Sequence, residues 1–364
     1  MPEAPLYPVS RVHLDVLTDE TGIHQHAVGS RPDPKHGYCV DDVARALQVD
    51  LLHGRELGWD AVATSAWRSL RFLEDAFDRP SGRFRNFRRA DGAWLDGPAS
   101  EDSQGRAMLA LGEAVSSAGD REMIERASLL FMRALPAAQR VAAMRARSSV
   151  LLGCQAALPT LDDRPTTLAH RSIAHALRTE FDRAAGSDWP WPEARLTYEN
   201  ALPVRALLQA GIWLESPTMI RTGLNVLDWL IAVQVTRAGY LSPVGNTWWR
   251  AGGTKPQFDQ QPIEATAIML ASETAYRHTL DSKYRTAMEG AYGWFLGRND
   301  LGLDLADPRR GASFDGLTPT GVNLNQGAES TLMWSMALEH IREVRRDGDA
   351  ARRDEGATAM SVMR

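Results

Sequence analysis

Six segments of the sequence repeat one pattern, and this repetition constrains the fold more than any other feature. In each segment, a polar, loop-like stretch leads into an apolar helix that is rich in small residues and opens with acidic or amide side chains. The starts are about 46 to 64 residues apart, a regular spacing that predicts a repeat architecture. The segments are 41–47, 102–109, 147–152, 199–204, 261–265 and 325–330.

Amphipathic segments alternate with these small-residue helices. Their apolar residues recur at helical spacing, and they carry more charge. Strand-like alternation is scarce, while Pro and Gly gather in the connecting loops. The segments are 60–77, 120–134, 165–181, 216–234 and 281–297, and 10–17 supplies a sixth from the N-terminal end of the chain.

This alternation predicts an all-α fold, an (α/α)6 toroid or barrel with six inner and about six outer helices. The inner helices are then buried on all sides except at their N-terminal ends. An open helical solenoid is the competing fold, and it would place the polar helix starts along a concave ridge. We favour the toroid because six units are enough to close a ring.

The domain organisation follows from the same pattern. A chain of 364 residues is long enough for two average domains or one large one. No internal linker interrupts the repeats, so we expect one catalytic domain over residues 1–344. Residues 345–364 lose hydrophobic periodicity and gain charge, which predicts a charged, disordered tail.

Charge and composition exclude several classes of protein. A net charge of −5 leaves no basic stripe, so we expect no nucleic-acid partner. No run approaches 18 uninterrupted apolar residues, so we expect no membrane span. The first 16 residues lack the pattern of a signal peptide. The two cysteines, Cys39 and Cys154, cannot form a disulfide framework, and a cytoplasmic location is expected.

The polar residues at the helix starts should meet at one mouth of such a ring. Helix N-termini carry partial positive charge, which stabilises carboxylates. An Asp in this position is usually an N-cap, and Asp41 and Asp102 fit that purely structural role. Glu is a poor N-cap, yet Glu199, Glu264 and Glu329 occupy equivalent starts. This recurrence predicts a polar cavity, with the apolar third start playing only a structural part.

The segment 22–45 has the highest density of functional side chains. Three His, a Tyr and two Asp meet an Arg just before or inside the first inner helix, and we expect them to form one wall of an active site. The expected substrate ligands here are His26, His36, Tyr38, Asp41 and Arg45.

A metal site is the alternative interpretation of this segment. His24, His26, His36 and Cys39 offer imidazole and thiolate ligands. Their spacing matches no familiar zinc pattern, and a ring of carboxylates needs no metal for acid–base chemistry. We therefore expect neither a metal nor another cofactor.

Two further segments carry side chains suited to sugars. A stiff Trp-Pro loop at 188–193 precedes the fourth start, and an aromatic platform beside carboxylate and amide groups suits a pyranose ring. A glycine-punctuated loop at 314–329 feeds the sixth start and lets the backbone approach a ligand closely. With the helix starts included, these regions supply the expected ligands Arg106, Trp191, Asn200, Gln261, Asp315, Asn325, Gln326 and Glu329.

Carboxylates at helix starts suggest a reaction as well as a site. Cleavage of a glycosidic bond needs an acid that protonates the leaving oxygen and a carboxylate that activates water or attacks carbon. Asp42 and Asp102 open consecutive inner helices, and Glu264 lies deeper; with Glu199 they are the catalytic candidates. A helix-start Asp beside an Arg is equally compatible with a permanently ionised structural group. The proton donor should be the carboxyl whose surroundings raise its pKa.

With these motifs, the sequence resembles the six-hairpin (α/α)6 glycosidase-like superfamily, and within it bacterial domains that are often fused to glycosyltransferases. The resemblance lies in residues 36–47, 102–106, 198–201, 261–265 and 325–330, and it covers about residues 20–340. It implies an enzyme that cleaves a glycosidic bond in an oligosaccharide such as a mannoside. It also implies an association with a glycosyltransferase.

Related members of that superfamily offer other reactions. Unsaturated-uronide hydrolases use Asp residues on successive inner helices, and the spacing of Asp42 and Asp102 is compatible with that use. Sugar 2-epimerases use His as acid and base, whereas the later starts here carry Glu264 and Glu329, which disfavours epimerisation. A phosphorylase would need an anion site, for which Arg45, Arg106 and His36 are the candidates. A non-catalytic glycan-binding or glycosyltransferase-associated module is the alternative to an enzyme.

Overall fold

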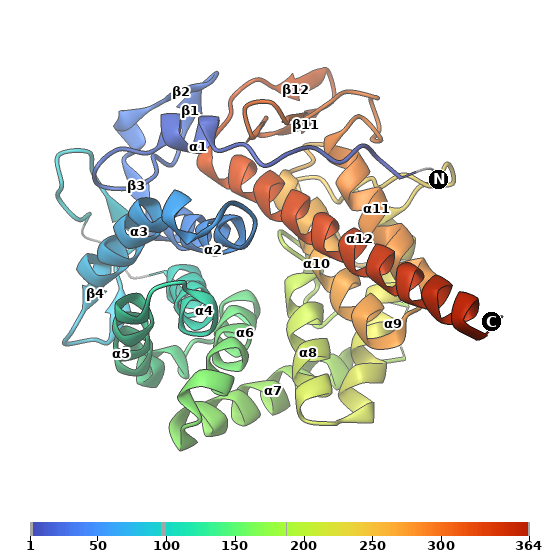
Figure 1. Ribbon diagram of the computed structural model, residues 1–364, viewed down its shortest axis with the longest axis horizontal. Helices are drawn as coiled ribbons and strands as arrows, with labels where there is room; N and C mark the ends of the chain where they lie inside the picture. Colours follow the sequence, from blue (N-terminus) through green and yellow to red (C-terminus); the bar gives the residue numbers. More distant parts are fainter. Residues whose placement is uncertain (1–2, 96–99, 187, 363–364) are drawn as a thin grey trace.

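The chain closes into a ring of helices. The computed structural model describes residues 3–95, 100–186 and 188–362, with side chains up to residue 348. Within these residues, strands occur only as short two-stranded pairs. Six helices surround the axis, and others flank them on the outside (Figure 1). The predicted all-α (α/α)6 toroid is confirmed.

The inner ring is formed by the helices that the repeated motif predicts. Each inner helix packs against its neighbours in chain order, and the sixth packs against the first, which closes the ring. Their apolar and small residues are buried on both flanks. The inner helices are α2 (Val40–Leu57), α4 (Glu101–Ser117), α6 (Met144–Leu161), α8 (Leu202–Trp213), α10 (Pro262–Thr279) and α12 (Ala328–Val362).

Five outer helices each follow an inner helix and pack against it. Three of them begin at an Asp whose side chain accepts a hydrogen bond from a backbone N–H of the first turn: Asp120, Asp163 and Asp281. Each overlaps an amphipathic segment that the sequence predicts. The outer helices are α3 (Ala63–Ala76), α5 (Arg121–Ala138), α7 (Arg164–Ala184), α9 (Pro217–Gln234) and α11 (Ser282–Phe295).

The sixth outer position is filled by a short helix and an extended strap. Helix α1 (Val12–Leu17) lies against α12, and the residues before it run along α12 in Figure 1. The strap is held by its backbone carbonyls: the Tyr292 hydroxyl donates to Pro5 O (3.0 Å), and Arg342 Nη1 donates to Tyr7 O (2.7 Å). The predicted helix at 10–17 is thus present but spans fewer than two turns.

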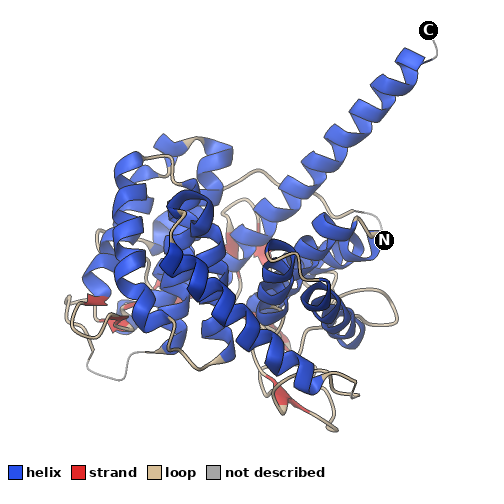
Figure 2. Cartoon of the chain, turned by 90° about the horizontal axis from the view of Figure 1, so that it is seen from below, coloured by secondary structure: helices blue, strands red, loops and turns tan. Residues whose placement is uncertain are grey.

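Helix α12 continues beyond the ring and projects from the body in Figure 2. The helix passes without a break through residue 345, where the tail predicted to be disordered begins. Ion pairs hold the first residues of that segment to the body: Arg345 to Glu289 (2.5 Å), and Asp347 to Arg277 (2.7 Å). The division of the chain at residue 345 stays a prediction.

Short antiparallel pairs join the loops at the N-terminal ends of the inner helices. One pair links the loop before α2 to the loop before α4, another links the loops before α8 and α10, and a bridge between Gln260 and Leu317 links those before α10 and α12. The first two pairs are β3 (Tyr38–Cys39) with β6 (Phe87–Arg88), and β7 (Arg195–Leu196) with β8 (Trp249–Arg250).

The remaining strand pairs are hairpins within single loops, and two 3-10 turns complete the regular structure. The pairs are β1 (Ala27–Val28) with β2 (Arg31–Pro32), β4 (Phe77–Asp78) with β5 (Arg83–Phe84), β9 (Ala306–Asp307) with β10 (Ala312–Ser313), and β11 (Gly316–Thr318) with β12 (Gly321–Asn323). The turns are η1 (Pro34–His36) and η2 (Trp59–Ala61). Among the described helices, none combines the length and apolarity needed to cross a bilayer.

Glycines bring α4 and α6 into backbone contact, the tightest contact of the inner ring. A Cβ added at Gly112 would lie 2.1 Å from Gly153 O, and one added at Gly105 would lie 2.7 Å from Ala146 O. Backbone atoms at this distance cannot rotate away as a flexible side chain can. The small residues of the predicted inner helices are therefore required where two helices touch.

Gly112→Ala should lower the free energy of unfolding by about 1–3 kcal/mol, because the added methyl group overpacks the α4–α6 contact. Gly290→Ala is the matched control, since a Cβ at that position in α11 meets nothing within 4 Å. It should raise stability by about 0.5–1 kcal/mol through helix propensity. Urea denaturation of both variants measures the difference. Equal effects would mean that α4 and α6 are not packed this closely.

Candidate active site

Hydrogen bonds from side chains, some to backbone groups and some to other side chains, tie the N-terminal ends of four inner helices together. Glu101 at the start of α4 accepts from the backbone N–H groups of Ala142 (2.9 Å) and Ala143 before α6. Arg145 in α6 donates to Asn200 Oδ1 (3.0 Å), in the loop before α8. Asn200 Nδ2 donates in turn to Glu264 in α10 (2.9 Å). The helix starts therefore do converge on one mouth.

A cavity of about 440 Å³ opens at this mouth, between the starts of α2 and α12 and the loop before α10. Seven residues that the sequence predicts as site residues line it together: His26, Asp41, Asp42, Arg45, Gln261, Asp315 and Glu329. The rest of its wall is Gln25, Cys39, Asn86, Phe87, Asn323, Gly327 and Ser330. Of these, Asn86 and Asn323 are polar contributors absent from the predicted site residues. Asn86 lies in an irregular loop, and Asn323 ends β12 within the glycine-punctuated segment before α12.

Arg45 lies between two carboxylates in this cavity. Its Nη1 donates to Asp42 Oδ1 (3.0 Å), and its Nη2 lies 3.1 Å from Glu329 Oε2. Arg45 and Asp42 are buried, at 3% and 5% exposed, whereas the Glu329 side chain is 41% exposed. Asp41 lines the same cavity, and its Oδ1 is buried without a hydrogen-bond partner. The Arg45 guanidinium thus pairs with two carboxylates, those of Asp42 and Glu329.

Burial and this excess of acid over base together set the protonation of Asp42. Burial raises the pKa of Asp42 to about 7, against the opposing effect of Arg45; the charges of Glu329 and Asp41 raise it further. A carboxyl that titrates near neutrality can hold a proton and release it. Glu329, at the open end of the same guanidinium, is accessible to water and substrate.

Other side chains complete the wall of the cavity. His26 packs edge-on against His36, with ring centroids 4.6 Å apart, and burial followed by the His36 charge lowers the pKa of His26. Asp315 Oδ1 accepts from Gly327 N (2.8 Å) and so fixes the start of α12. Gln261 precedes α10, and its side chain makes no capping hydrogen bond. These groups place hydrogen-bond donors and acceptors in the wall of the cavity.

Asp102 lies at the start of α4, outside the lining of this cavity. Its Oδ2 accepts a hydrogen bond from the Tyr198 hydroxyl, and the Arg145 guanidinium lies over the Tyr198 ring, 4.7 Å from the centroid. Arg145 also pairs with Glu193 (3.0 Å). The third helix start, expected to be apolar and structural, thus carries a buried Arg that organises its neighbours. The sequence motif misses Arg145 because it places the third helix start near Arg147, whereas α6 begins three residues earlier, at Met144.

Glu199 is a partner for a buried cation inside the ring. It accepts two hydrogen bonds from Arg106, one at 2.8 Å, and both residues line a narrow internal cavity of about 20 Å³. Burial alone would raise the pKa of Glu199, but Arg106 and then Arg45 outweigh it, and the pKa is lowered. Glu199 therefore stays ionised, which is unsuited to a proton donor.

Glu264 is buried, at 3% exposed, and both of its hydrogen bonds come from Asn200. Its Oε2 accepts from Asn200, and its Oε1 has no hydrogen-bond partner. Burial raises the pKa of Glu264 to about 7, with Asn200 and Arg145 opposing. The group does not line the 440 Å³ cavity. Its predicted catalytic role, like those of Asp102 and Glu199, stays a prediction.

The remaining predicted ligands lie outside the lining of this cavity. The Tyr38 hydroxyl donates to Asp19, and the His36 side chain is 55% exposed. The Asn325 side chain accepts from Gly29 N (3.0 Å), and the Gln326 carbonyl bonds His13 (2.9 Å). Trp191 is buried at 2% exposure beside a separate cavity of about 670 Å³.

The four residues weighed as a metal site do not converge. His24 stacks on Tyr38 and pairs with Asp19, and Cys39 Sγ donates to Asn86 Oδ1 (3.7 Å). Burial also raises the pKa of the Cys39 thiol, which disfavours the thiolate that binds metals. Within the described part of the chain, the residues that do bring three such ligand atoms together are Glu273, His340 and Glu343, in the last two turns of α10 and the middle of α12.

Solved structures with the same fold include carbohydrate-active enzymes. A cellobiose 2-epimerase from Spirochaeta thermophila has a TM-score of 0.69 at 16% identity, over 91% of this chain and 92% of the other. A D-mannose isomerase gives 0.69 at 11% identity, over 92% and 95%. An α-mannanase of family GH76 from Bacteroides thetaiotaomicron gives 0.59 at 13%, over 85% and 88%. No protein-family model and no curated protein sequence matches the chain. At these identities, the likeness shows the (α/α)6 fold.

Glu264→Gln and Glu199→Gln should change stability in opposite directions. Folding raises the pKa of Glu264, so the free energy of unfolding falls as the pH rises from 4.5 to about 7. Glu264→Gln removes that ionisation and should stabilise the protein by about 1–3 kcal/mol at pH 8, with little effect at pH 5. Glu199→Gln leaves Arg106 buried without a counter-charge and should cost about 3–5 kcal/mol.

Urea denaturation at pH 5 and pH 8 measures both effects on matched isosteric changes. A Glu264→Gln variant that is destabilised at pH 8 as strongly as Glu199→Gln would contradict the assignment. Glu264 would then be a permanently ionised, paired group.

Proposed function

We propose that this protein is an enzyme that cleaves a glycosidic bond in an oligosaccharide, at the cavity between α2 and α12. The observation that supports this most directly is the placement of Asp42 and Glu329 on either side of Arg45. One acid titrates near neutrality and is buried, while the other is open to the cavity. This is the division of roles that acid–base glycoside hydrolysis requires.

In the proposed reaction, the protonated Asp42 donates its proton to the glycosidic oxygen as the bond to the anomeric carbon breaks. Glu329 accepts a proton from a water molecule, whose oxygen forms the new bond to that carbon. The leaving sugar gains the proton from Asp42, and the other sugar gains the hydroxyl. Arg45 stabilises the carboxylate that forms on Asp42.

Amide side chains support a sugar as the substrate. Gln261, Asn86 and Asn323 line the same cavity and offer both donors and acceptors to hydroxyl groups. Hydrolysis is favoured over phosphorolysis, because two of the three candidates for a phosphate site, Arg45 and Arg106, are already paired with carboxylates, and the third, His36, lies outside the lining of the cavity. A mannoside substrate, a cytoplasmic location and an association with a glycosyltransferase remain proposals drawn from the sequence.

Epimerisation or isomerisation of a sugar is the second candidate. It is favoured by His26, an imidazole with a lowered pKa in the wall of the cavity. Structures with this fold include a cellobiose 2-epimerase and a D-mannose isomerase. Deprotonation next to a carbonyl would exchange the C2 hydrogen with solvent. Incorporation of deuterium from D2O into recovered sugar, without bond cleavage, would identify this reaction.

Asp42→Asn and Glu329→Gln should each lower kcat on a cleaved oligosaccharide by about 10²- to 10⁴-fold, because each removes one proton-transfer group. In the native protein, kcat/KM should fall as the pH rises above about 7, when Asp42 loses its proton. Product analysis over a panel of defined oligosaccharides measures turnover.

Glu113→Gln is the control, since Glu113 lies in α4, accepts from Gln48 Nε2 and is absent from the cavity wall. Full activity in both cavity variants, with the control unchanged, would rule out Asp42 and Glu329 as acid and base. Sugar binding without turnover across the whole panel would instead support a non-catalytic glycan-binding module.

A further inference from the structure

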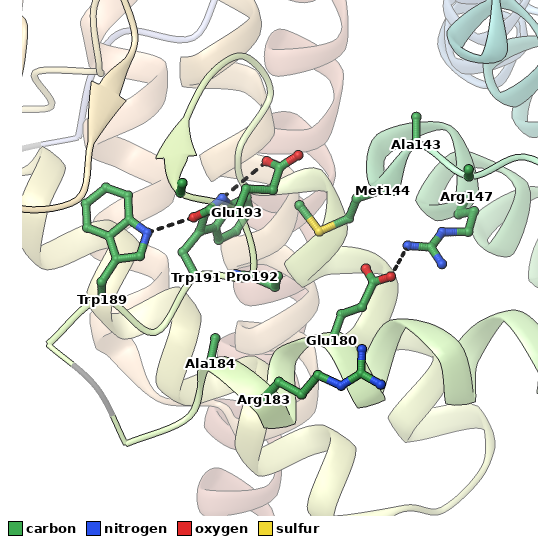
Figure 3. Close-up of a pocket in the computed structure, with 12 residues that line it drawn as sticks. Ala143, Met144, Arg147, Glu180, Arg183, Ala184, Trp189, Trp191, Pro192 and Glu193 are labelled. Atoms are coloured by element: carbon green, nitrogen blue, oxygen red, sulfur yellow. Dashed lines mark hydrogen bonds and ion pairs between the residues drawn. The ribbon is translucent and has the colours of Figure 1, made fainter.

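A second cavity, of about 670 Å³, lies outside the inner ring at the same end of the molecule (Figure 3). It is bounded by the start of α6, the end of α7 and the loop before β7. Its volume is within the usual range for small-molecule sites. None of its lining residues is shared with the cavity between α2 and α12. In the ring order, α6 lies opposite α12.

One wall of this cavity is a rigid aromatic surface. Trp189 Nε1 donates to Glu193 O (2.9 Å), and Trp191 Nε1 donates to Glu193 Oε2 (3.3 Å). Each ring also packs edge-on against another aromatic ring: Trp189 against Trp229, and Trp191 against Phe181. Since both indole N–H groups point to Glu193, the loop is held in a fixed orientation. Trp191 is buried at 2% exposure, so the ring carbon accessible to a ligand is that of the partly exposed Trp189.

The opposite wall is charged and leaves one cation unpaired. Arg147 and Glu180 form an ion pair across the cavity wall, and Glu193 is neutralised from the ring side by Arg145. Arg183 near the end of α7 is exposed, and within the described residues it has no hydrogen-bond or ion-pair partner; Figure 3 shows its side chain at the cavity. The paired carboxylates retain oxygen atoms that can accept from hydroxyl groups.

We propose that this cavity is a second binding site, for a sugar unit that carries a negatively charged group. The accessible carbon surface of Trp189 suits the apolar face of a pyranose ring. Glu180 and Glu193 accept from its hydroxyls, and Arg183 binds the anion through charge-assisted hydrogen bonds. A uronate carboxylate and a sugar phosphate share this chemistry. The site is separate from the proposed reaction centre and does not depend on it.

Isothermal titration with three probes tests the proposal: methyl glucuronide, glucose 6-phosphate and the uncharged methyl glucoside. The native protein should bind at least one charged probe more tightly than the glucoside. Arg183→Gln should weaken binding of that probe about tenfold and leave the glucoside unaffected. Arg171→Gln, an exposed change on the same helix outside the cavity, should have no effect. The preferred charged probe identifies carboxylate or phosphate as the group recognised.

Asp42→Asn separates this site from the reaction centre, because it should leave charged-probe binding intact even if it abolishes turnover. Three outcomes would overturn the proposal. They are no binding of either charged probe at millimolar concentration, equal weakening by Arg183→Gln and Arg171→Gln, and loss of binding in Asp42→Asn but not in Arg183→Gln.

Discussion

Three buried guanidinium groups at the mouth of the ring must each find a carboxylate, and the closed toroid is the arrangement that provides them. Arg45, Arg106 and Arg145 come from the first two turns of α2, α4 and α6, and all are at most 5% exposed. A buried charge without a partner costs several kcal/mol. The partners come from later in the chain: α12 for the first, and the loop before α8 for the other two. Arg45 also pairs with Asp42 of its own helix, so what closure of the ring adds is the contact between Arg45 and Glu329, which an open solenoid would not make.

The three pairings differ in a way that separates structure from chemistry. Arg106 and Glu199 are one cation and one anion inside the ring, and their mutual neutralisation leaves no group free to exchange a proton. Arg145 is shared among Glu193, Asn200 and the Tyr198 carbonyl, and it orders the loop before α8. Of these three arginines, Arg45 is the one that meets two carboxylates beside the cavity between α2 and α12. Burial of Asp42, together with the negative charges of Glu329 and Asp41, keeps a proton on it near neutral pH.

Much of this arrangement can be predicted from the sequence, and there are physical reasons why the other parts cannot. The repeat predicts the inner and outer helices, because a buried ring demands small residues at fixed spacing. It also predicts that Asp42, Glu329 and Asp315 share a site. It cannot rank the carboxylates, since Glu199 and Glu264 occupy similar starts yet differ in partner: Arg106 for one, Asn200 for the other. Arg145 escapes the motif because its role depends on residues brought together only by folding.

The central claim is that Asp42 holds a proton near neutral pH because it is buried and because the neighbouring charge of Glu329 competes with it for Arg45. Carbon-13 NMR titration of aspartate carboxyl groups measures this directly, with the Asp42 signal assigned by its absence in Asp42→Asn. The account predicts a pKa of about 7 for Asp42 in the native protein. In Glu329→Gln, the pKa should fall, because Arg45 then serves Asp42 without a competing charge. An Asp42 signal that titrates at the ordinary pKa of an aspartate in both proteins would contradict the account.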